Sequence, residues 1–261
     1  MRSAGASSPT ATIRNNVAYY LADKAVRLDR AQQYAEAAVT ATGVESRNLT
    51  LARISPRELN VVHSLASYWD TLGWVLYARG DLSRAEPLLK AAFTLSESGV
   101  VGDHLGQLYE KQGKRDQALR AYAMALKAER PETATRDRFR TLAGSENQEV
   151  LLQSHAGDFL TLRTVNVKPT GAKGMAEFFV LLGTQGIEDV SFVSGDAALR
   201  APAVVTAIRQ ADFRPLLPVN DGVGAKVLRR GGLSCSADSG AKARCSFILF
   251  PLSMTQPVAE N

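Results

Sequence analysis

Hydrophobic residues recur with a helical period through the first half of the chain. The apolar face of residues 82–95 consists of Leu82, Ala85, Leu88, Leu89, Ala92 and Phe93. The same period runs through 65–78, 101–111 and 115–128. Glycines that can end a helix, Gly80 and Gly113, separate these segments. The pattern therefore predicts two helical hairpins.

The two predicted hairpins repeat one another at an offset of 33 residues. Leu72-Gly73 matches Leu105-Gly106, Gly80 matches Gly113, and Ala85 matches Ala118. A glycine inside a helix costs about 1 kcal/mol relative to alanine, so its recurrence at one phase indicates close helix packing. The clearest copies are 66–98 and 99–131. Pro87 predicts a kink in the first copy.

The repeated residues resemble the tetratricopeptide repeat. The first copy carries Trp69-x-x-Leu72-Gly73 and Ala85-x-x-x-Leu89, and the second carries Leu105-Gly106-x-x-Tyr109 and Ala118-x-x-x-Tyr122. Gly102 departs from the usual Trp, Leu76 from the usual Tyr, and the spacing from the usual 34 residues. A degenerate third hairpin in 15–41 extends the predicted array to 13–140. We expect disorder in 1–12 and 255–261.

The second half of the chain changes to strand-like patterns. Apolar alternation or short apolar runs predict strands at 159–167, 176–182, 187–193, 226–234 and 244–250, with a helix at 197–211. The order β-β-β-α-β-β predicts a small α+β domain over 150–254. The expected fold is therefore mixed, with a helical array followed by a sheet domain.

Two further resemblances concern the second half and the whole chain. The stretch from Val193-Ser-Gly-Asp through Ala211-Asp-Phe-Arg-Pro215 to the last strands weakly resembles the C-terminal domain of TonB-like proteins. The whole chain resembles the tail of large bacterial tetratricopeptide proteins that carry transglutaminase-like domains upstream. That resemblance implies a scaffolding role at the cell envelope, and this chain contains none of the upstream catalytic part.

The tetratricopeptide resemblance implies a partner-binding groove. Carried onto this sequence, the groove positions are Asn16, Asp70 and Asp103, then Tyr20, Trp74 and Gln107, then Asp23, Tyr77 and Glu110. These aromatic and acidic side chains suit an extended or helical peptide with basic and apolar residues. The alternative is that Trp74 and Tyr77 pack within the chain.

The sequence offers little for catalysis, and we expect no enzyme activity, no cofactor and no metal site. His104 follows Asp103, but adjacent helical residues diverge by about 100°, so we interpret His104 as a helix-surface residue. His63 and His155 have no evident partners. Cys235 and Cys245 flank a nine-residue loop between two predicted strands. They are either disulfide-bonded, in an oxidising compartment, or reduced.

Charge and hydropathy narrow the partners further. The net charge of +5 is spread without a dense basic cluster, so nucleic-acid binding is not expected. No apolar run approaches 18 residues, so no membrane span is expected. No export signal is visible, and neither location nor oligomeric state follows from the sequence. The leading hypothesis is a non-catalytic protein-interaction scaffold. The alternative is a structural tail of a larger envelope protein, docking intramolecularly.

Overall fold

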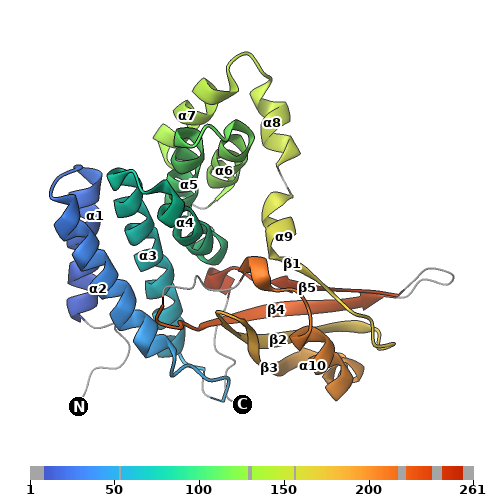
Figure 1. Ribbon diagram of the computed structural model, residues 1–261. Coiled ribbons are helices and arrows are strands. Elements are labelled where there is room, and N and C mark those ends of the chain that lie inside the picture. Colours follow the sequence, from blue (N-terminus) through green and yellow to red (C-terminus); the bar gives the residue numbers. More distant parts are fainter. Residues whose placement is uncertain are drawn as a thin grey trace. The chain divides into compact units, whose positions relative to one another are not determined.

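A computed structural model describes residues 9–52, 54–128, 131–155, 157–216, 222–236 and 243–254. It combines a helical region with a small α+β part, as expected from the sequence (Figure 1). The described residues form two compact units. One draws on 7–42 and 64–161, and the other on 43–63 and the residues from 162 onward. The disorder expected in 1–8 and 255–261 lies outside the described residues. Residues 9–12, also expected to be disordered, belong to the first helix.

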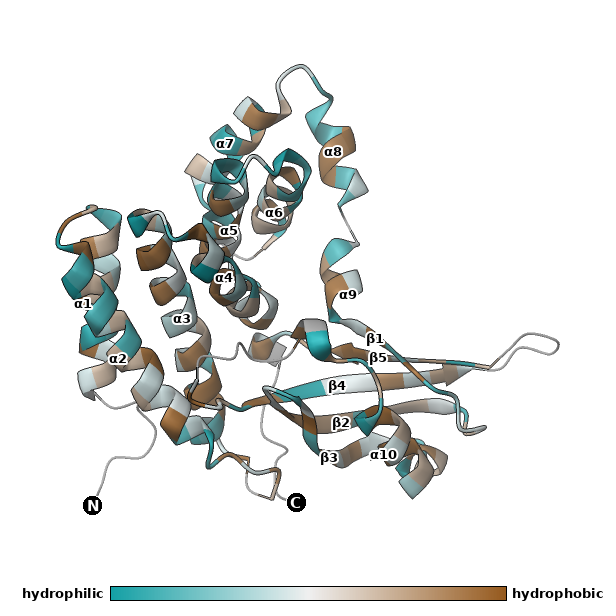
Figure 2. Cartoon of the chain, in the orientation of Figure 1, coloured by the Kyte–Doolittle hydropathy of each residue, from teal (hydrophilic) through white to brown (hydrophobic). Residues whose placement is uncertain are grey.

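Helices account for all regular structure up to residue 163. They are α1 (Pro9–Asp23), α2 (Leu28–Ser46), α3 (Pro56–Arg79), α4 (Leu82–Ser96), α5 (Gly99–Lys111), α6 (Arg115–Lys127), α7 (Thr133–Ala143), α8 (Gln148–Ser154) and α9 (Asp158–Arg163). Among the described residues, none of these helices combines the length and hydropathy needed to cross a bilayer. In Figure 2, hydrophobic residues follow several turns of α3, whereas α1 carries many hydrophilic ones.

The hairpins α3–α4 and α5–α6 match the elements predicted from the repeat. Gly80 takes a φ of 84° and ends α3, and the Asp81 carboxylate accepts a hydrogen bond from the Arg84 backbone N–H at the start of α4. Pro87 lies inside α4 without ending it. The buried residues of α4 include most of the predicted apolar face, namely Ala85, Leu88, Leu89, Ala92 and Phe93.

The two repeated glycines lie at close helix contacts. A Cβ at Gly73 would come within 2.7 Å of Leu89 Cγ on α4. A Cβ at Gly106 would come within 2.3 Å of Tyr122 Cε1 on α6. Each glycine thus admits a large side chain from the second helix of its own hairpin. This is the close packing that the repeat predicted.

The helical region continues further than the sequence predicted. Residues 141–148 were expected to end it, but α7, α8 and α9 follow one another up to Arg163. The first half of the strand predicted at 159–167 is therefore helical. Asp158 begins α9 and binds His155 and Arg120, while the Phe159 ring lies 5.4 Å from Phe93. These tertiary contacts override a weak alternation of apolar residues.

The sheet confirms the predicted strand order with shifted boundaries. Its strands are β1 (Thr164–Val167), β2 (Gly174–Gly183), β3 (Gly186–Gly195), β4 (Val227–Ser236) and β5 (Arg244–Leu249). They pair antiparallel in the order β1-β5-β4-β2-β3. The predicted helix at 197–211 is split into η1 (Ala197–Arg200) and α10 (Pro202–Arg209). Pro202 forces extended backbone on Ala201, which breaks the helix.

An aromatic cluster forms the core of the sheet unit. The Phe178 ring packs edge-on against Phe192 at 5.6 Å, and the Phe247 ring meets Phe213 at 5.7 Å. Phe178 and Phe247 themselves lie 6.2 Å apart. The cluster joins β2, β3, β5 and the segment after α10. It gives this unit a hydrophobic core of its own.

The outer edge of the sheet at β3 is partly capped by side chains. The Val190 backbone N–H donates to the Asp189 carboxylate at 2.9 Å. Arg209 of α10 donates to the same carboxylate at 2.7 Å and to the Glu188 carbonyl at 3.4 Å. Charged side chains on an edge strand discourage pairing with another strand. The middle of this edge is therefore a poor template for strand addition.

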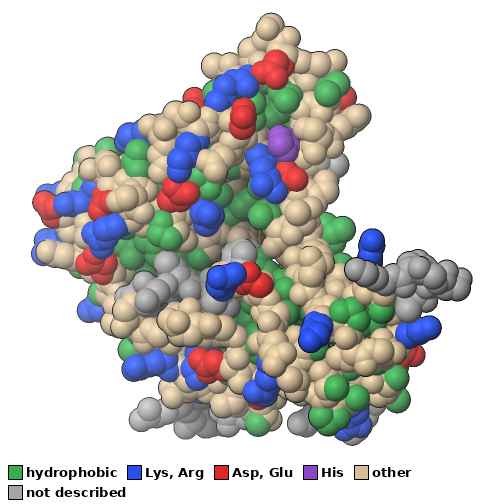
Figure 3. All heavy atoms as spheres, turned by 45° about the vertical axis from the view of Figure 1, so that its right-hand side comes forward, with side chains coloured by type: hydrophobic (Ala, Val, Ile, Leu, Met, Phe, Trp, Pro, Cys, Tyr) green, Lys and Arg blue, Asp and Glu red, His purple; other side chains and the backbone are tan. Residues whose placement is uncertain are grey.

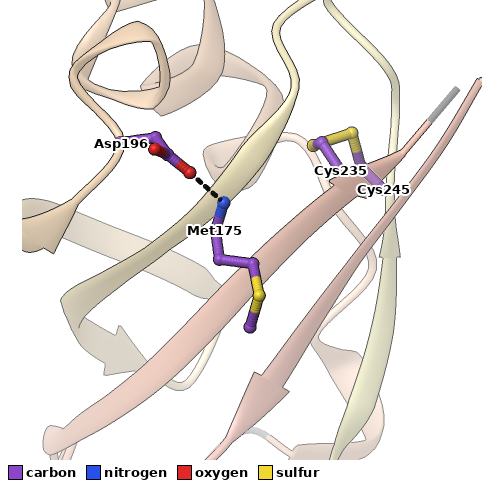
Figure 4. Close-up of a disulfide and its surroundings, with 4 residues drawn as sticks. All are labelled: Met175, Asp196, Cys235 and Cys245. Carbon is purple, nitrogen blue, oxygen red and sulfur yellow. Dashed lines mark hydrogen bonds between the residues drawn. A yellow bond between two sulfur atoms is a disulfide. The ribbon is translucent and has the colours of Figure 1, made fainter.

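The two cysteines lie opposite each other on neighbouring strands. Cys235 of β4 pairs with Cys245 of β5 in the sheet register, and their sulfur atoms are bonded (Figure 4). Beside the bond, the Met175 backbone N–H at the start of β2 donates to Asp196 at 2.7 Å. The disulfide closes a loop of known length between two hydrogen-bonded strands. It belongs to the sheet unit and not to the helical face considered below.

The glycine contact predicts a cost for the smallest possible substitution. Gly106→Ala should lower the free energy of unfolding by about 1–3 kcal/mol, because the new methyl group displaces the Tyr122 ring. This loss should appear although alanine favours the helix intrinsically. Urea unfolding followed by circular dichroism measures it. Gly157→Ala, where a Cβ meets nothing within 4 Å, is the control and should leave stability nearly unchanged.

The disulfide predicts a second stability difference. Protein from an oxidising compartment should show no free thiol on titration. The Cys235→Ala/Cys245→Ala variant should unfold at a free energy lower by roughly 2–3 kcal/mol, because the unfolded chain gains loop entropy. A reductant should lower the parent toward the variant and leave the variant unchanged. Two reactive thiols in the folded parent would contradict the bond.

Candidate partner-binding surface

The candidate site is a face of the helical unit to which α1, α3 and α5 contribute. Asp70, Trp74 and Tyr77 are spaced by four and three residues on α3, so they share one side of the helix. The α5 residues predicted for the groove have the same spacing: Asp103, Gln107 and Glu110. The structure therefore brings these two predicted sets together, and we call this face the groove face.

A buried ion pair joins α3 to α5 beneath the groove face. His104 Nδ1 lies 2.9 Å from Asp70 Oδ1, and both residues are buried. The Trp74 ring stacks on the His104 ring at 4.1 Å and 13°. The Tyr77 ring stacks on Trp74 at 4.6 Å and 9°. Both faces of the indole are thus occupied within the chain, and Trp74 holds the face together.

The ion pair sets the protonation of His104. Burial by itself lowers the pKa of His104, but the Asp70 carboxylate, its hydrogen bond and the more distant Asp103 outweigh that effect. The pKa of His104 is therefore raised above its usual value. A protonated imidazole beside an ionised carboxylate leaves the pair with no net charge.

The second predicted acid of the groove is also paired. Arg138 of α7 donates to both oxygens of Asp103, at 3.0 and 2.8 Å. Gln107 donates to the same carboxylate at 2.7 Å. Asp103 is buried, so its charge is compensated inside the protein. Neither Asp70 nor Asp103 is a free surface charge, as the sequence-based groove assumed.

One end of the groove face opens into a pocket of about 370 Å³, which we call the Lys111 pocket. Its lining residues are Tyr77, Gln107, Glu110, Lys111 and Arg138. The Lys111 ammonium lies 4.5 Å from the centre of the Tyr77 ring. Glu110 accepts a hydrogen bond from the Tyr122 hydroxyl at 2.7 Å. The pocket presents two cationic groups beside one carboxylate that is already hydrogen-bonded.

The other end holds a second pocket of about 370 Å³, the Asp70 pocket. It lies among α1, α3 and the start of α5. Its polar lining consists of Asn15, Asn16, Tyr19, Ser67, Asp70, Thr71, Ser96 and Ser98. Amides and hydroxyls dominate, and Asp70 is the charged residue in its lining. The two pockets therefore differ in charge and in hydrogen-bonding character.

The remaining predicted groove residues divide between the pocket and the solvent. Asn16 lines the Asp70 pocket. Tyr20 is 62% exposed and lines neither pocket. Its neighbour Tyr19 lines the Asp70 pocket and lies 6.1 Å from the His104 ring. In the degenerate first hairpin, the groove position is thus taken by the residue before the one that the alignment selected.

Sequence reasoning missed the residue at the centre of the site. His104 is 5% exposed, so its interpretation as a helix-surface histidine was wrong. The 33-residue offset aligns Asp103 with Asp70 and places His104 one position further on. Equivalent turns of neighbouring helices can meet, and that relation was available as a signal. Arg138 lies outside the two clear repeat copies and left no such signal.

Other polar clusters were also compared with the sequence predictions. His155, expected to have no partner, lies 2.7 Å from Asp158, which also binds Arg120 at 2.8 Å. Within the described ranges, no group of three or more His, Cys, Asp or Glu residues is placed to hold a metal ion. In the face drawn in Figure 3, basic and acidic side chains are interspersed over the surface. These features add no second candidate site.

The His104–Asp70 pair predicts a pH-dependent stability. Since the folded pKa of His104 is raised, the pair stabilises the fold fully below about pH 6.5, the unfolded value, and loses this contribution as pH rises through the folded pKa. Asp70→Asn should cost about 3 kcal/mol at acidic pH and less at alkaline pH. Urea unfolding over a pH series measures the difference. Adding Asp70→Asn to a His104→Gln variant is the control and should have an effect independent of pH.

Comparisons of the chain with protein-family models, with curated proteins and with solved structures found no match.

Proposed function

We propose that this chain is a non-catalytic interaction scaffold of the tetratricopeptide type, which binds an extended segment of a protein partner along the groove face. The observation that carries the proposal is the pair of open pockets on one helical face, at Asp70 and at Lys111. Repeat arrays use faces of this kind to bind extended partners. Concave sites with a few placed polar groups are the usual locations of ligands.

The helical packing supports the repeat assignment. Gly73 and Gly106 occupy equivalent positions, and each admits a side chain from the second helix of its hairpin. The α5–α6 and α4–α5 pairs pack as successive neighbours in the helical unit. A short array of stacked hairpins accounts for both observations.

The partner chemistry differs from the sequence-based expectation at one end of the groove. Asp103 is neutralised by Arg138, so it does not attract a basic partner there. Lys111 and Arg138 line the pocket instead, with the Gln107 amide beside them. We assign this pocket to an acidic side chain or a terminal carboxylate of the partner, because cationic donors form the stronger hydrogen bonds with carboxylates.

The alternative proposal is a structural tail of a larger cell-envelope protein, docking intramolecularly. The disulfide between Cys235 and Cys245 favours it, because disulfides persist mainly in oxidising compartments. In this case the groove face would bind a segment of the same polypeptide and not a separate partner. The chemistry of the bound segment would be the same.

The test uses peptides selected from a random display library against the full chain. Lys111→Glu should weaken their binding at least about tenfold, since hydrogen bonds to charged groups contribute about 1.5–3 kcal/mol. Lys90→Glu on α4 is the matched control, because Lys90 is exposed, lies in neither pocket and undergoes the same charge change. Calorimetric titration measures the affinities. Failure to select any saturable binder, or equal loss in both variants, would contradict the proposal.

A further inference from the structure

The Asp70 pocket contains a buried acceptor that the fold does not use. Asn15 is 8% exposed and lines the pocket. Among the described residues, no donor lies within hydrogen-bonding distance of its side-chain oxygen. Buried polar atoms are nearly always hydrogen-bonded, and leaving one without a partner costs free energy. An acceptor in this state at the wall of an open pocket points to a donor supplied from outside.

A second acceptor lines the same pocket. Asp70 binds His104 through Oδ1, and its carboxylate is among the groups that line the pocket. The other side chains of the lining are neutral hydroxyls and amides. The walls therefore offer acceptors, and no cationic side chain belongs to the lining.

The surrounding charges agree with this polarity. Tyr19 forms part of the pocket wall. Burial raises its pKa first, and the carboxylates of Asp70, Asp23, Glu132 and Asp103 raise it further. Cations balance some of these acids: His104 faces Asp70, Arg138 faces Asp103, and Lys24 faces Asp23. The acids still dominate at Tyr19, which favours a positively charged group in the pocket.

We propose that the Asp70 pocket binds the primary ammonium group of a lysine side chain from the partner segment, with Asn15 and Asp70 as acceptors. This inference rests on the proposed function, since the lysine belongs to the segment bound along the groove face. An ammonium group carries three donors on a compact charge. A guanidinium fits less well, because its planar fork requires a carboxylate with both oxygens available, and His104 already engages one of them.

The distance between the pockets adds a spacing rule. Asp70 and Tyr77 lie seven residues apart on α3, which corresponds to about 10 Å along the helix axis. An extended segment rises about 3.3 Å per residue. The lysine in the Asp70 pocket and the acidic group in the Lys111 pocket should therefore be separated by about three residues. The partner segment would carry opposite charges at that spacing.

The first test measures the ammonium group alone. The probe is Nα-acetyl-lysine amide, and its Nε-acetylated form is the uncharged counterpart. Titration of the full chain, followed by amide NMR shifts, should show saturable changes at Ser67 and Thr71 with the charged probe and none with the acetylated one. 1,4-Diaminobutane distinguishes the sources: tighter binding of this free diamine than of the lysine probe would favour a small-molecule amine and overturn the assignment to a partner's lysine.

Three variants make the test specific. Ser67 is exposed at the pocket wall, so substitution there does not threaten folding. Ser67→Lys should abolish binding of the lysine probe, and Ser67→Glu should strengthen it several-fold. Asn15→Leu should weaken it about tenfold by removing an acceptor of a charge-assisted hydrogen bond. Equal binding of both probes, or an unchanged affinity in the two Ser67 variants, would overturn the inference.

Lys111→Glu separates this inference from the proposed function. It should leave the lysine probe unaffected, because Lys111 does not line the Asp70 pocket. If selected peptides ignore Lys111→Glu while the lysine probe still responds to Ser67, the ammonium site stands and the proposed groove fails. If the peptides respond to Lys111→Glu and the lysine probe never binds, the groove stands and the ammonium site fails.

Discussion

The buried contact between His104 and Asp70 is the constraint on which the groove face depends. It joins α3 to α5 across two repeat copies, at a position where each helix would otherwise bury a polar group without a partner. The Trp74 ring lies on the imidazole and fixes the Tyr77 ring in turn. Because a buried charge is tolerated only when it is paired, the two helices have one favourable register. The positions of both pockets follow from that register.

The chemistry that remains on the groove face is what the internal pairing leaves unused. Asp70 and Asp103 would make the face acidic, but His104 and Arg138 compensate them. Lys111 remains at one pocket, and the Asn15 oxygen remains at the other. Selectivity for a partner would then come from a difference between two ends of one face and not from its total charge. Such a pattern fixes the direction of a bound segment as well as its composition.

The sheet unit follows a separate physical logic. Its phenylalanine cluster supplies a core across three strands, and the disulfide joins two of the strands that carry it. At the exposed edge of β3, Asp189 and Arg209 occupy backbone groups that would otherwise pair with another strand. This unit is therefore stabilised internally and protected at its edge. Partner binding is assigned to the helical unit because the open pockets lie there.

The sequence alone determined the helical hairpins, the repeat offset and the strand order, because these follow from local periodicity and turn residues. Gly73 and Gly106 announced a close contact before their neighbours were known. Local pattern did not determine the helix at 158–163, where contacts of Asp158 and Phe159 decided the outcome. Nor did it identify His104, Arg138 or Asn15 as site residues. The reason is that burial and pairing depend on which helices meet, and only the tertiary structure brings together residues 34 and 35 positions apart.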